Sequence, residues 1–546
     1  MQTSLKPSLA GSPGPIRRSP TRRDYLFLFL GLMALFAYAA PRWNDWNQNS
    51  RLSLVRSIVD SGTVQIDAFS AANGDYAYYN GHYYSDKPPG PALAGVIPYA
   101  VLKLALSNPL ADWLLDKVSK SSSFSRTFSE GSVAGVADST PRDKLLGALA
   151  RIWLSLLLVA LPVALMLCCF WAWTCQITGR YRTSLALTLG LALGTTLFPY
   201  SSLFYSNALT AALLFISFFL LYKAKERVLE RAKEKAGQHP VPGKLYWLVG
   251  TLLGLSVISQ YETVLIAAPL GLYALAHPAT WRERGRRTLW LVLGGLPPGL
   301  VLVIYDLVSF NTPLPVGYEY SILWADRHSQ GFLSLTYPHL EAVWGLTFSP
   351  YRGLFLLSPF LLLALPGYYF GLRRAGLRLE TALCLWSSLA FFLFNTSSAM
   401  WWGGFTFGPR YMISCLPFLA LAVALLVREA DLRHWPGLGW WFGLPVALSV
   451  LIVLPASLVG RDWPSEAYQN PLPEFLWPKL LAGDLARNPG MALGLKGPLS
   501  YLPLLLALGL LYGALYHWPR GFPPGTGRNP APQENGLALK LMEPEK

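Results

Sequence analysis

Long runs of apolar residues alternate with shorter polar connections along most of the chain. Several runs reach the roughly 18–20 residues that a helix needs to cross the hydrocarbon core of a bilayer. They are continuous rather than alternating, which favours helices over the strands of a membrane barrel. The runs lie near 25–41, 91–106, 146–174, 183–199, 203–222, 245–258, 261–276, 288–309, 354–371, 380–395, 411–427, 437–459 and 499–517. The pattern predicts an all-α polytopic membrane protein.

The run at 91–106, PALAGVIPYAVLKLAL, decides how many helices span. It is short, contains Pro98 and Lys103, and follows two prolines at 88 and 89. These features suit a re-entrant or interfacial helix better than a span. If this run does not cross, the remaining runs predict about 12 transmembrane helices.

Composition and charge agree with this reading. The chain is 53% hydrophobic and only 14% charged, which is too apolar for an ordinary soluble protein of 546 residues. Its net charge of +15 is concentrated in connections such as 223–235, 281–287 and 373–378. With about 12 spans these basic segments all face the cytoplasm, as the positive-inside rule requires. Both termini are then cytoplasmic, and nucleic acid is not an expected partner.

The spans and charges divide the chain into three parts. Residues 1–24, rich in Ser, Pro and Arg, predict a disordered cytoplasmic tail, and 518–546 predict a flexible cytoplasmic one. Between them, 25–517 form the transmembrane domain, whose first extracytoplasmic loop is 42–145. The basic start and the Ala-Tyr-Ala after the first run also resemble a signal peptide, but an uncleaved first helix suits a chain with many later spans better.

That first loop holds an unusual polar and aromatic stretch, NGDYAYYNGHYYSDKPPG, at 73–90. It contains Asp75 and the adjacent pair Asp86 and Lys87. Upstream, 49–59 carries apolar residues on one side and arginines elsewhere, which predicts an amphipathic helix flat on the membrane surface. A long ordered loop is costly unless it has a function, so the candidate chemistry lies here.

An interfacial helix with Arg51 followed by the sequence DKPPG at 86–90 resembles the GT-C glycosyltransferases. The closest similarity is to the family 39 group, which includes protein O-mannosyltransferases and lipid A aminoarabinose transferases. The segments SPYRGLFLLSPFLLL (349–363) and GGFTFGPRYMISCLPFL (403–419) are similar to a bacterial branch of these enzymes. The resemblance implies a multi-pass protein of a bacterial-type cell membrane, and transfer of a sugar from a polyprenyl-phosphate carrier to an acceptor at the extracytoplasmic face.

The resemblance also implies roles for particular residues. An acidic residue of the first loop acts as general base on the acceptor hydroxyl, while Lys and Arg hold the phosphate of the lipid donor. The candidate bases are Asp75, Asp86 and Asp45. The candidate phosphate ligands are Lys87, Arg51, Arg352 and Arg410. His82, Tyr84 and Glu262 are predicted to line the substrate site.

This chain departs from the family pattern at one point. Where relatives carry an acidic pair before the arginine, it reads Gln-Asn-Ser-Arg at 48–51, so the choice between the three aspartates stays open. No His, Asp or Glu cluster has metal-ligand spacing, and because only some family members need a divalent cation, a cation also stays open. Two rival hypotheses are a transporter or flippase for a lipid-linked glycan and a non-catalytic scaffold of the same fold.

Overall fold

A computed structural model describes residues 20–40, 45–121, 141–233, 242–331, 334–460 and 463–517. Within these ranges the regular secondary structure is helical except for one short hairpin, which confirms the predicted all-α membrane class. Most of both predicted tails, residues 1–19 and 518–546, lies outside the described residues.

Seven stretches of the described chain are long and apolar enough to cross a membrane, or up to eight if a bent helix pair counts as one span. They comprise α6 with α7 (Pro141–Ser155, Leu161–Thr178), α10 (Ser206–Lys233), α13 (Trp281–Phe310), α18 (Arg378–Thr396), α19 (Leu416–Leu432), α20 (Leu444–Ser457) and α23 (Leu502–His517). Shorter apolar helices are α11 (Gly243–Ser259) and α12 (Val264–Ala276). The first helix, α1 (Arg22–Ala39), packs against α23. The count of about 12 spans stays a prediction.

Two of the predicted runs are broken helices. The run at 183–199 gives α8 (Tyr181–Leu193) and the short α9 (Leu197–Ser201), with Gly194 between them. The run at 354–371 gives α16 (Leu354–Leu357), a 3₁₀ turn and α17 (Ala364–Arg373). Pro359 opens that turn, since proline has no N–H with which to continue a helix. Apolar run length therefore overstates the number of long helices.

Burial separates central from peripheral helices. In the most apolar window of each span, 78% of α10 and 89% of the stretch containing α19 is buried. The corresponding share is 22% for α13 and 11% for α23. Helices that expose this much apolar surface on a bundle are expected to face lipid.

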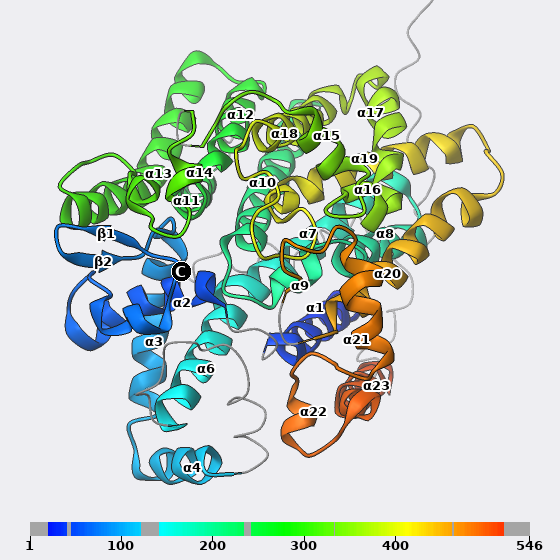
Figure 1. Cartoon of the computed structure of the whole chain (residues 1–546). Helices are drawn as coiled ribbons and strands as arrows, with labels where there is room; N and C mark the ends of the chain where they lie inside the picture. The colour runs from blue at the N-terminus through cyan, green and yellow to red at the C-terminus, as the bar shows by residue number, and fades with distance from the viewer. Residues whose placement is uncertain are drawn as a thin grey trace, which may run out of the picture.

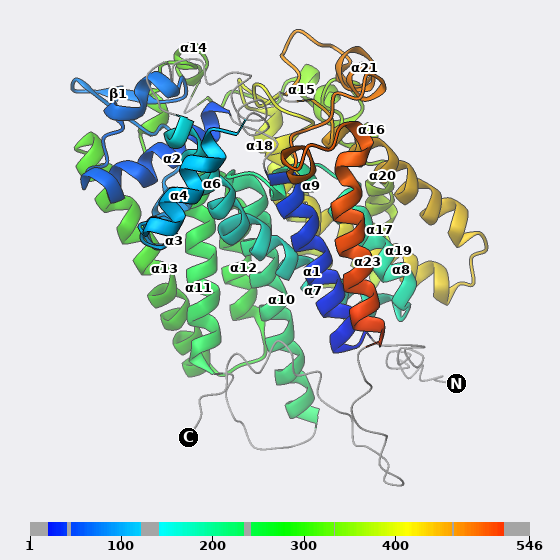
Figure 2. The same cartoon turned by 90° about the horizontal axis from the view of Figure 1, so that it is seen from below.

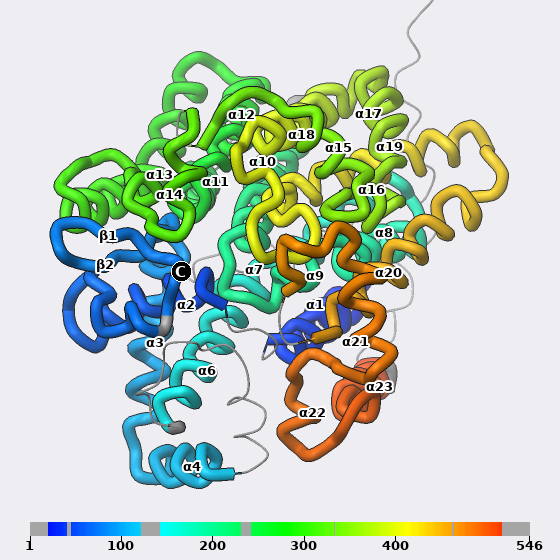
Figure 3. Tube along the Cα trace, in the orientation of Figure 1, coloured from blue at the N-terminus to red at the C-terminus, as the bar shows by residue number. Residues whose placement is uncertain are grey.

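The connecting elements gather at one end of the bundle. Figure 2 shows the hairpin strand β1 and helices α14 (Ala325–His328), α15 (Leu340–Thr347) and α21 (Trp477–Leu481) at that end. The basic end of α10 projects from the opposite end. Viewed onto the loops, α2 (Trp46–Arg56) and the hairpin lie beside α14 (Figure 1). The tube view shows the loop 398–410 next to the segment that follows α20 (Figure 3). Segments distant in sequence thus meet at one end.

Helix α2 corrects the prediction of a surface helix at 49–59. It begins after its N-cap Asp45 and runs to Arg56. Leu52, Leu54 and Val55 are buried, and so is Arg51 at 3% exposure. The helix is packed inside the loop layer, so Arg51 does not extend to lipid headgroups.

The aromatic stretch forms a hairpin of β1 (Ala77–Tyr79) and β2 (His82–Tyr84). Its turn residues, Asn80 and Gly81, have φ of 48° and 86°, the left-handed backbone that an Asn-Gly turn adopts readily. The reversal returns the chain from Asp75 to Lys87. The helix that follows, α3 (Gly90–Ala105), meets α4 (Pro109–Ser119) at an angle of 95°, the geometry of a broken span or a re-entrant loop.

Candidate functional site

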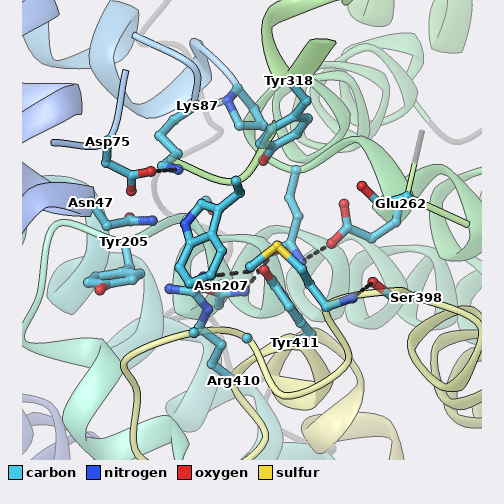
Figure 4. Close-up of a pocket in the computed structure, with 18 of the residues that line it drawn as sticks. Asn47, Asp75, Lys87, Tyr205, Asn207, Glu262, Tyr318, Ser398, Arg410 and Tyr411 are labelled. Carbon is cyan, nitrogen blue, oxygen red and sulfur yellow. Dashed lines mark hydrogen bonds and ion pairs between the residues drawn. The ribbon is translucent and has the colours of Figure 1, made fainter. Parts of the chain in front are cut away.

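A cavity of about 430 Å³ opens among the loop elements. It is lined from six parts of the chain: the start of α2, the hairpin region, the start of α10, the 260–262 turn, the 318–335 loop and the 394–411 segment, with Trp463 in addition. Figure 4 draws 18 of the lining residues and labels ten, with Asp75 and Lys87 on one side and Glu262 on the other. Its cationic lining residues are Arg51, Lys87 and Arg410, and its carboxylates are Asp45, Asp75 and Glu262.

Lys87 sits between two carboxylates. Its Nζ lies 2.7 Å from Asp75 Oδ1 and 3.1 Å from Asp86 Oδ2, and all three residues are at least nine-tenths buried. Burial alone would lower the pKa of Lys87, but the charges of Asp75 and Asp86 outweigh it and raise the pKa above its ordinary value. The ammonium is therefore the form present at neutral pH.

Asp75 and Asp86 occupy different positions around that lysine. Asp75 lines the cavity, with its backbone N–H donating to Asn73 Oδ1 at 3.1 Å. Asp86 does not line it and instead accepts a hydrogen bond from Ser321 Oγ at 3.0 Å. Asp86 thus lies behind Lys87, where it can hold the ammonium but not reach a bound molecule.

Arg51 and Arg410 line the cavity without a carboxylate partner in the described part of the chain. Arg51 donates to the side-chain oxygen of Asn47 and to Ser206 Oγ at 3.3 Å. Arg410 donates to the Tyr411 hydroxyl at 3.2 Å, and its guanidinium lies over the rings of Tyr205 and Tyr411, 5.7 and 5.0 Å from their centroids. Burying a cation among neutral partners is costly unless an anion joins it. Arg51 and Arg410 therefore stay candidate ligands for an anion.

Asp45 lines the cavity but is engaged as a helix cap. Its Oδ1 accepts the backbone N–H of Gln48 at 2.9 Å, and its Oδ2 accepts the Gln48 side-chain amide at 3.0 Å. The first of these bonds caps a backbone N–H group at the N-terminus of α2, and both stabilise the start of the helix that carries Arg51. The contacts favour a structural role for Asp45.

Glu262 lies across the cavity, in the 3₁₀ turn between α11 and α12. It accepts a 2.6 Å hydrogen bond from Gln260 Nε2. The oxygen of the same amide accepts bonds from Thr210 and Ser414 at 3.0 and 3.3 Å. Because an ionised carboxylate can only accept, Gln260 turns its NH₂ group toward Glu262 and its oxygen toward the two hydroxyls.

Arg352 is not a cavity residue, which corrects its prediction as a phosphate ligand. It is fully buried, and its guanidinium donates to the carbonyl oxygens of Thr406 and Gly404, the latter at 3.0 Å. It also lies over the ring of Tyr351, 4.4 Å from the centroid. Arg352 therefore fixes the loop that carries Arg410.

His82 and Tyr84 also lie outside the lining of the cavity, which corrects their prediction as substrate-lining residues. His82 is partly exposed and its Nδ1 is 2.8 Å from Asp67 Oδ2. Tyr84 is 5% exposed and packs against Phe310, with ring centroids 5.3 Å apart. The first steadies the loop, and the second anchors the hairpin in a hydrophobic cluster.

The structure adds lining residues that the sequence did not single out. Tyr318, Trp324 and His328 come from the second loop, and Tyr205 and Trp463 from elsewhere. His328 packs against Tyr318, with ring centroids 5.0 Å apart, and burial lowers the pKa of His328 to about 4. The density of aromatic and His residues in GYEYSILWADRH at 317–328 was the available signal.

No group of three or more His, Cys, Asp or Glu side chains that could hold a metal ion occurs within the residues that the structure describes. The sequence left a divalent cation open, and this observation does not decide it.

Asp86 gives a pH-dependent prediction. Burial, with the charge of Asp75 adding to it, raises the pKa of Asp86 from 3.8 to about 6. Between these values the folded chain binds a proton that the unfolded chain lacks, so this contribution to stability is present below pH 3.8 and is lost as pH rises through about 6. We expect Asp86→Asn to raise the thermal unfolding midpoint relative to wild type at pH 7.5 but not at pH 4.5, measured in detergent. An equal difference at both pH values would contradict this account.

Known proteins were compared with the chain in three ways. No family model matches it, and no curated protein matches it. Solved structures similar to this one include ArnT from Cupriavidus metallidurans bound to undecaprenyl phosphate, with 14% identity over 89% of this chain and 76% of that one and a TM-score of 0.40. They also include the apo oligosaccharyltransferase of Archaeoglobus fulgidus, with 12% identity over 80% of this chain and 55% of that one and a TM-score of 0.39.

Proposed function

We propose that this protein is a membrane glycosyltransferase that moves a sugar from a polyprenyl-phosphate carrier to an acceptor at the loop end of the bundle. The supporting observation is that Lys87, Arg51 and Arg410 line one cavity, and that the two arginines have no carboxylate partner among the described residues. A phosphate supplies the missing anion, and guanidinium groups bind it through charge-assisted hydrogen bonds.

The rest of the lining suits a sugar at the membrane surface. Tyr205, Tyr318, Trp324 and Trp463 offer flat apolar faces together with hydroxyl and indole donors. Such rings also prefer the headgroup region of a bilayer. A lipid-borne donor would place its phosphate and sugar at this depth.

The proposed chemistry divides between two kinds of side chain. The cations bind the carrier phosphate and stabilise the charge it gains as the sugar leaves. A carboxylate in the cavity takes the proton of the acceptor hydroxyl as that oxygen attacks the sugar. The sugar and the acceptor, whether glycan, lipid or protein, are the open part of the proposal.

Transfer is tested with protein reconstituted in lipid vesicles. We expect wild-type protein to move radiolabel from at least one of a panel of undecaprenyl-phosphate-linked sugars to a bacterial cell-envelope fraction. Arg51→Ala should lower the rate by about tenfold or more, since a charge-assisted bond to phosphate is lost. Arg327→Ala, which removes an exposed arginine of α14 outside the cavity lining, serves as control.

Two results would contradict the proposal. One is that no donor in the panel is cleaved by the wild-type protein. The other is that an intact labelled lipid crosses the vesicle membrane without loss of its sugar, which is the result expected of a flippase.

A further inference from the structure

The cavity contains three carboxylates, and their partners differ. Asp75 is paired with the Lys87 ammonium at 2.7 Å, and both oxygens of Asp45 are bound by Gln48. Glu262 accepts a hydrogen bond from the neutral amide of Gln260 and, among the described residues, forms no ion pair. A carboxylate held by a cation is a poor proton acceptor, because the cation stabilises its charged form. Burial raises the pKa of Glu262 above its ordinary value, although the Gln260 hydrogen bond and the charge of Arg410 act against it.

Asp75 and Glu262 also differ in where they lie in the cavity. In a direct displacement at a sugar carbon, the attacking oxygen and the leaving group lie on opposite faces of that carbon. Asp75 adjoins Lys87, so it lies on the side proposed for the leaving phosphate. Figure 4 shows Glu262 on the other side of the cavity from that pair. A base for the acceptor hydroxyl belongs on the side where Glu262 lies.

The surroundings of Glu262 also hold it in place. Gln260 is 4% exposed, and its amide oxygen accepts hydrogen bonds from Thr210 on α10 and from Ser414 beside α19. These two donors come from the most deeply buried spans of the bundle. Through the Gln260 NH₂ group, a rigid part of the core therefore orients one oxygen of Glu262. The second oxygen is left to meet an acceptor.

We infer that Glu262, and not an aspartate of the first loop, is the general base of the proposed transfer, and that Gln260 is its positioning residue. This inference rests on the proposed function. The proton of the acceptor hydroxyl passes to Glu262 as the acceptor oxygen bonds to the sugar's anomeric carbon. The bond between that carbon and the phosphate oxygen breaks, and its electron pair stays on the phosphate, facing Lys87 and Arg410. Glu262 later returns its proton to solvent.

The test compares Glu262→Gln with Asp75→Asn in reconstituted protein, using the donor that wild type cleaves. We expect Glu262→Gln to reduce transfer by at least about 100-fold, the usual range for losing a general base, while binding of undecaprenyl phosphate changes less than about threefold. Asp75→Asn should weaken carrier binding, because it alters the Lys87 site. Gln260→Ala should lower kcat at an unchanged KM for the donor. Glu341→Gln, an exposed carboxylate of α15, is the control.

A folding defect is separated from a chemical one by rescue. Added formate should restore part of the activity of Glu262→Ala, since a small carboxylate can enter the vacated space, and should not affect Asp75→Asn. The inference is overturned if Glu262→Gln keeps more than about a third of wild-type transfer, or if formate fails to rescue Glu262→Ala that still binds undecaprenyl phosphate. Wild-type protein that transfers no sugar overturns the proposed function itself, and this inference with it.

Discussion

Replacing Lys87 by alanine is expected to reduce sugar transfer below detection. The Lys87 ammonium is the one cation described within 3.1 Å of both Asp75 and Asp86, and all three residues are buried. Its removal leaves two buried carboxylates facing each other, which repel and cannot be solvated. It also removes a charge that the leaving phosphate needs. Transfer and undecaprenyl phosphate binding should both be lost, as measured in vesicles.

A second variant separates function from folding in this prediction. Lys87→Ala combined with Asp86→Asn removes one of the two like charges, so it should recover part of the unfolding midpoint lost in Lys87→Ala while transfer stays undetectable. Lys103→Ala is the matched control, because Lys103 pairs with Asp60 at 2.8 Å and does not line the cavity. Transfer above about a tenth of the wild-type rate in the double variant would show that Lys87 is only structural.

The arrangement around Lys87 follows from local sequence. Asp86 and Lys87 are neighbours, and the Asn-Gly turn at 80–81 folds the preceding stretch into a hairpin that returns Asp75 to them. A two-residue turn fixes the register of its strands, so this contact depends on few long-range choices. The sequence DKPPG at 86–90, which resembles GT-C enzymes, ends the same stretch.

The two arginines of the later motifs show where sequence reasoning ends. Arg352 and Arg410 both follow an aromatic or glycine-rich segment at the outer end of a helix, and sequence alone gave them the same role. Tertiary packing separates them, because Arg352 turns inward to the carbonyl oxygens of Gly404 and Thr406 while Arg410 lines the cavity. The direction in which a loop side chain points depends on contacts with residues far away in sequence. A single sequence does not show which residues make those contacts.

The same reason explains the residues that were missed. Tyr318 and His328 lie in a connection without helical or strand periodicity, so apart from the density of aromatic and His residues at 317–328 nothing local marks them as lining residues. Glu262 could be singled out from the sequence because it is a charged residue between two apolar runs. Its partner Gln260 could not, because the orientation of its amide depends on hydrogen bonds with Thr210 and Ser414, which are distant in sequence. The number of long helices could not be predicted from the apolar runs for another reason. Proline and glycine break runs such as 183–199 into shorter helices.

Arg410→Ala is expected to weaken binding of undecaprenyl phosphate at least about 30-fold. Arg410 is held between Tyr205 and Tyr411 and donates only to neutral groups among the described residues, so in this proposal the carrier phosphate is its anionic partner. Removing one member of a buried charged pair costs about 2–5 kcal/mol. Since about 1.4 kcal/mol is a factor of ten, the expected range is about 30-fold to a few thousand-fold. Titration of vesicles with labelled undecaprenyl phosphate measures it.

Conservative replacement tests whether charge alone suffices at this position. Lysine keeps the charge of Arg410 but cannot lie flat between two rings or donate two parallel hydrogen bonds, so Arg410→Lys should bind the carrier with an intermediate loss of about tenfold. Arg433→Ala removes an arginine that pairs with Glu429 outside the cavity and should bind as wild type does. Wild-type affinity in Arg410→Ala would mean that the phosphate lies elsewhere. Because Arg51 and Arg410 both lie near the Tyr205 ring, Arg51→Ala should then be normal as well, and the anion site would have to be placed on Lys87 alone.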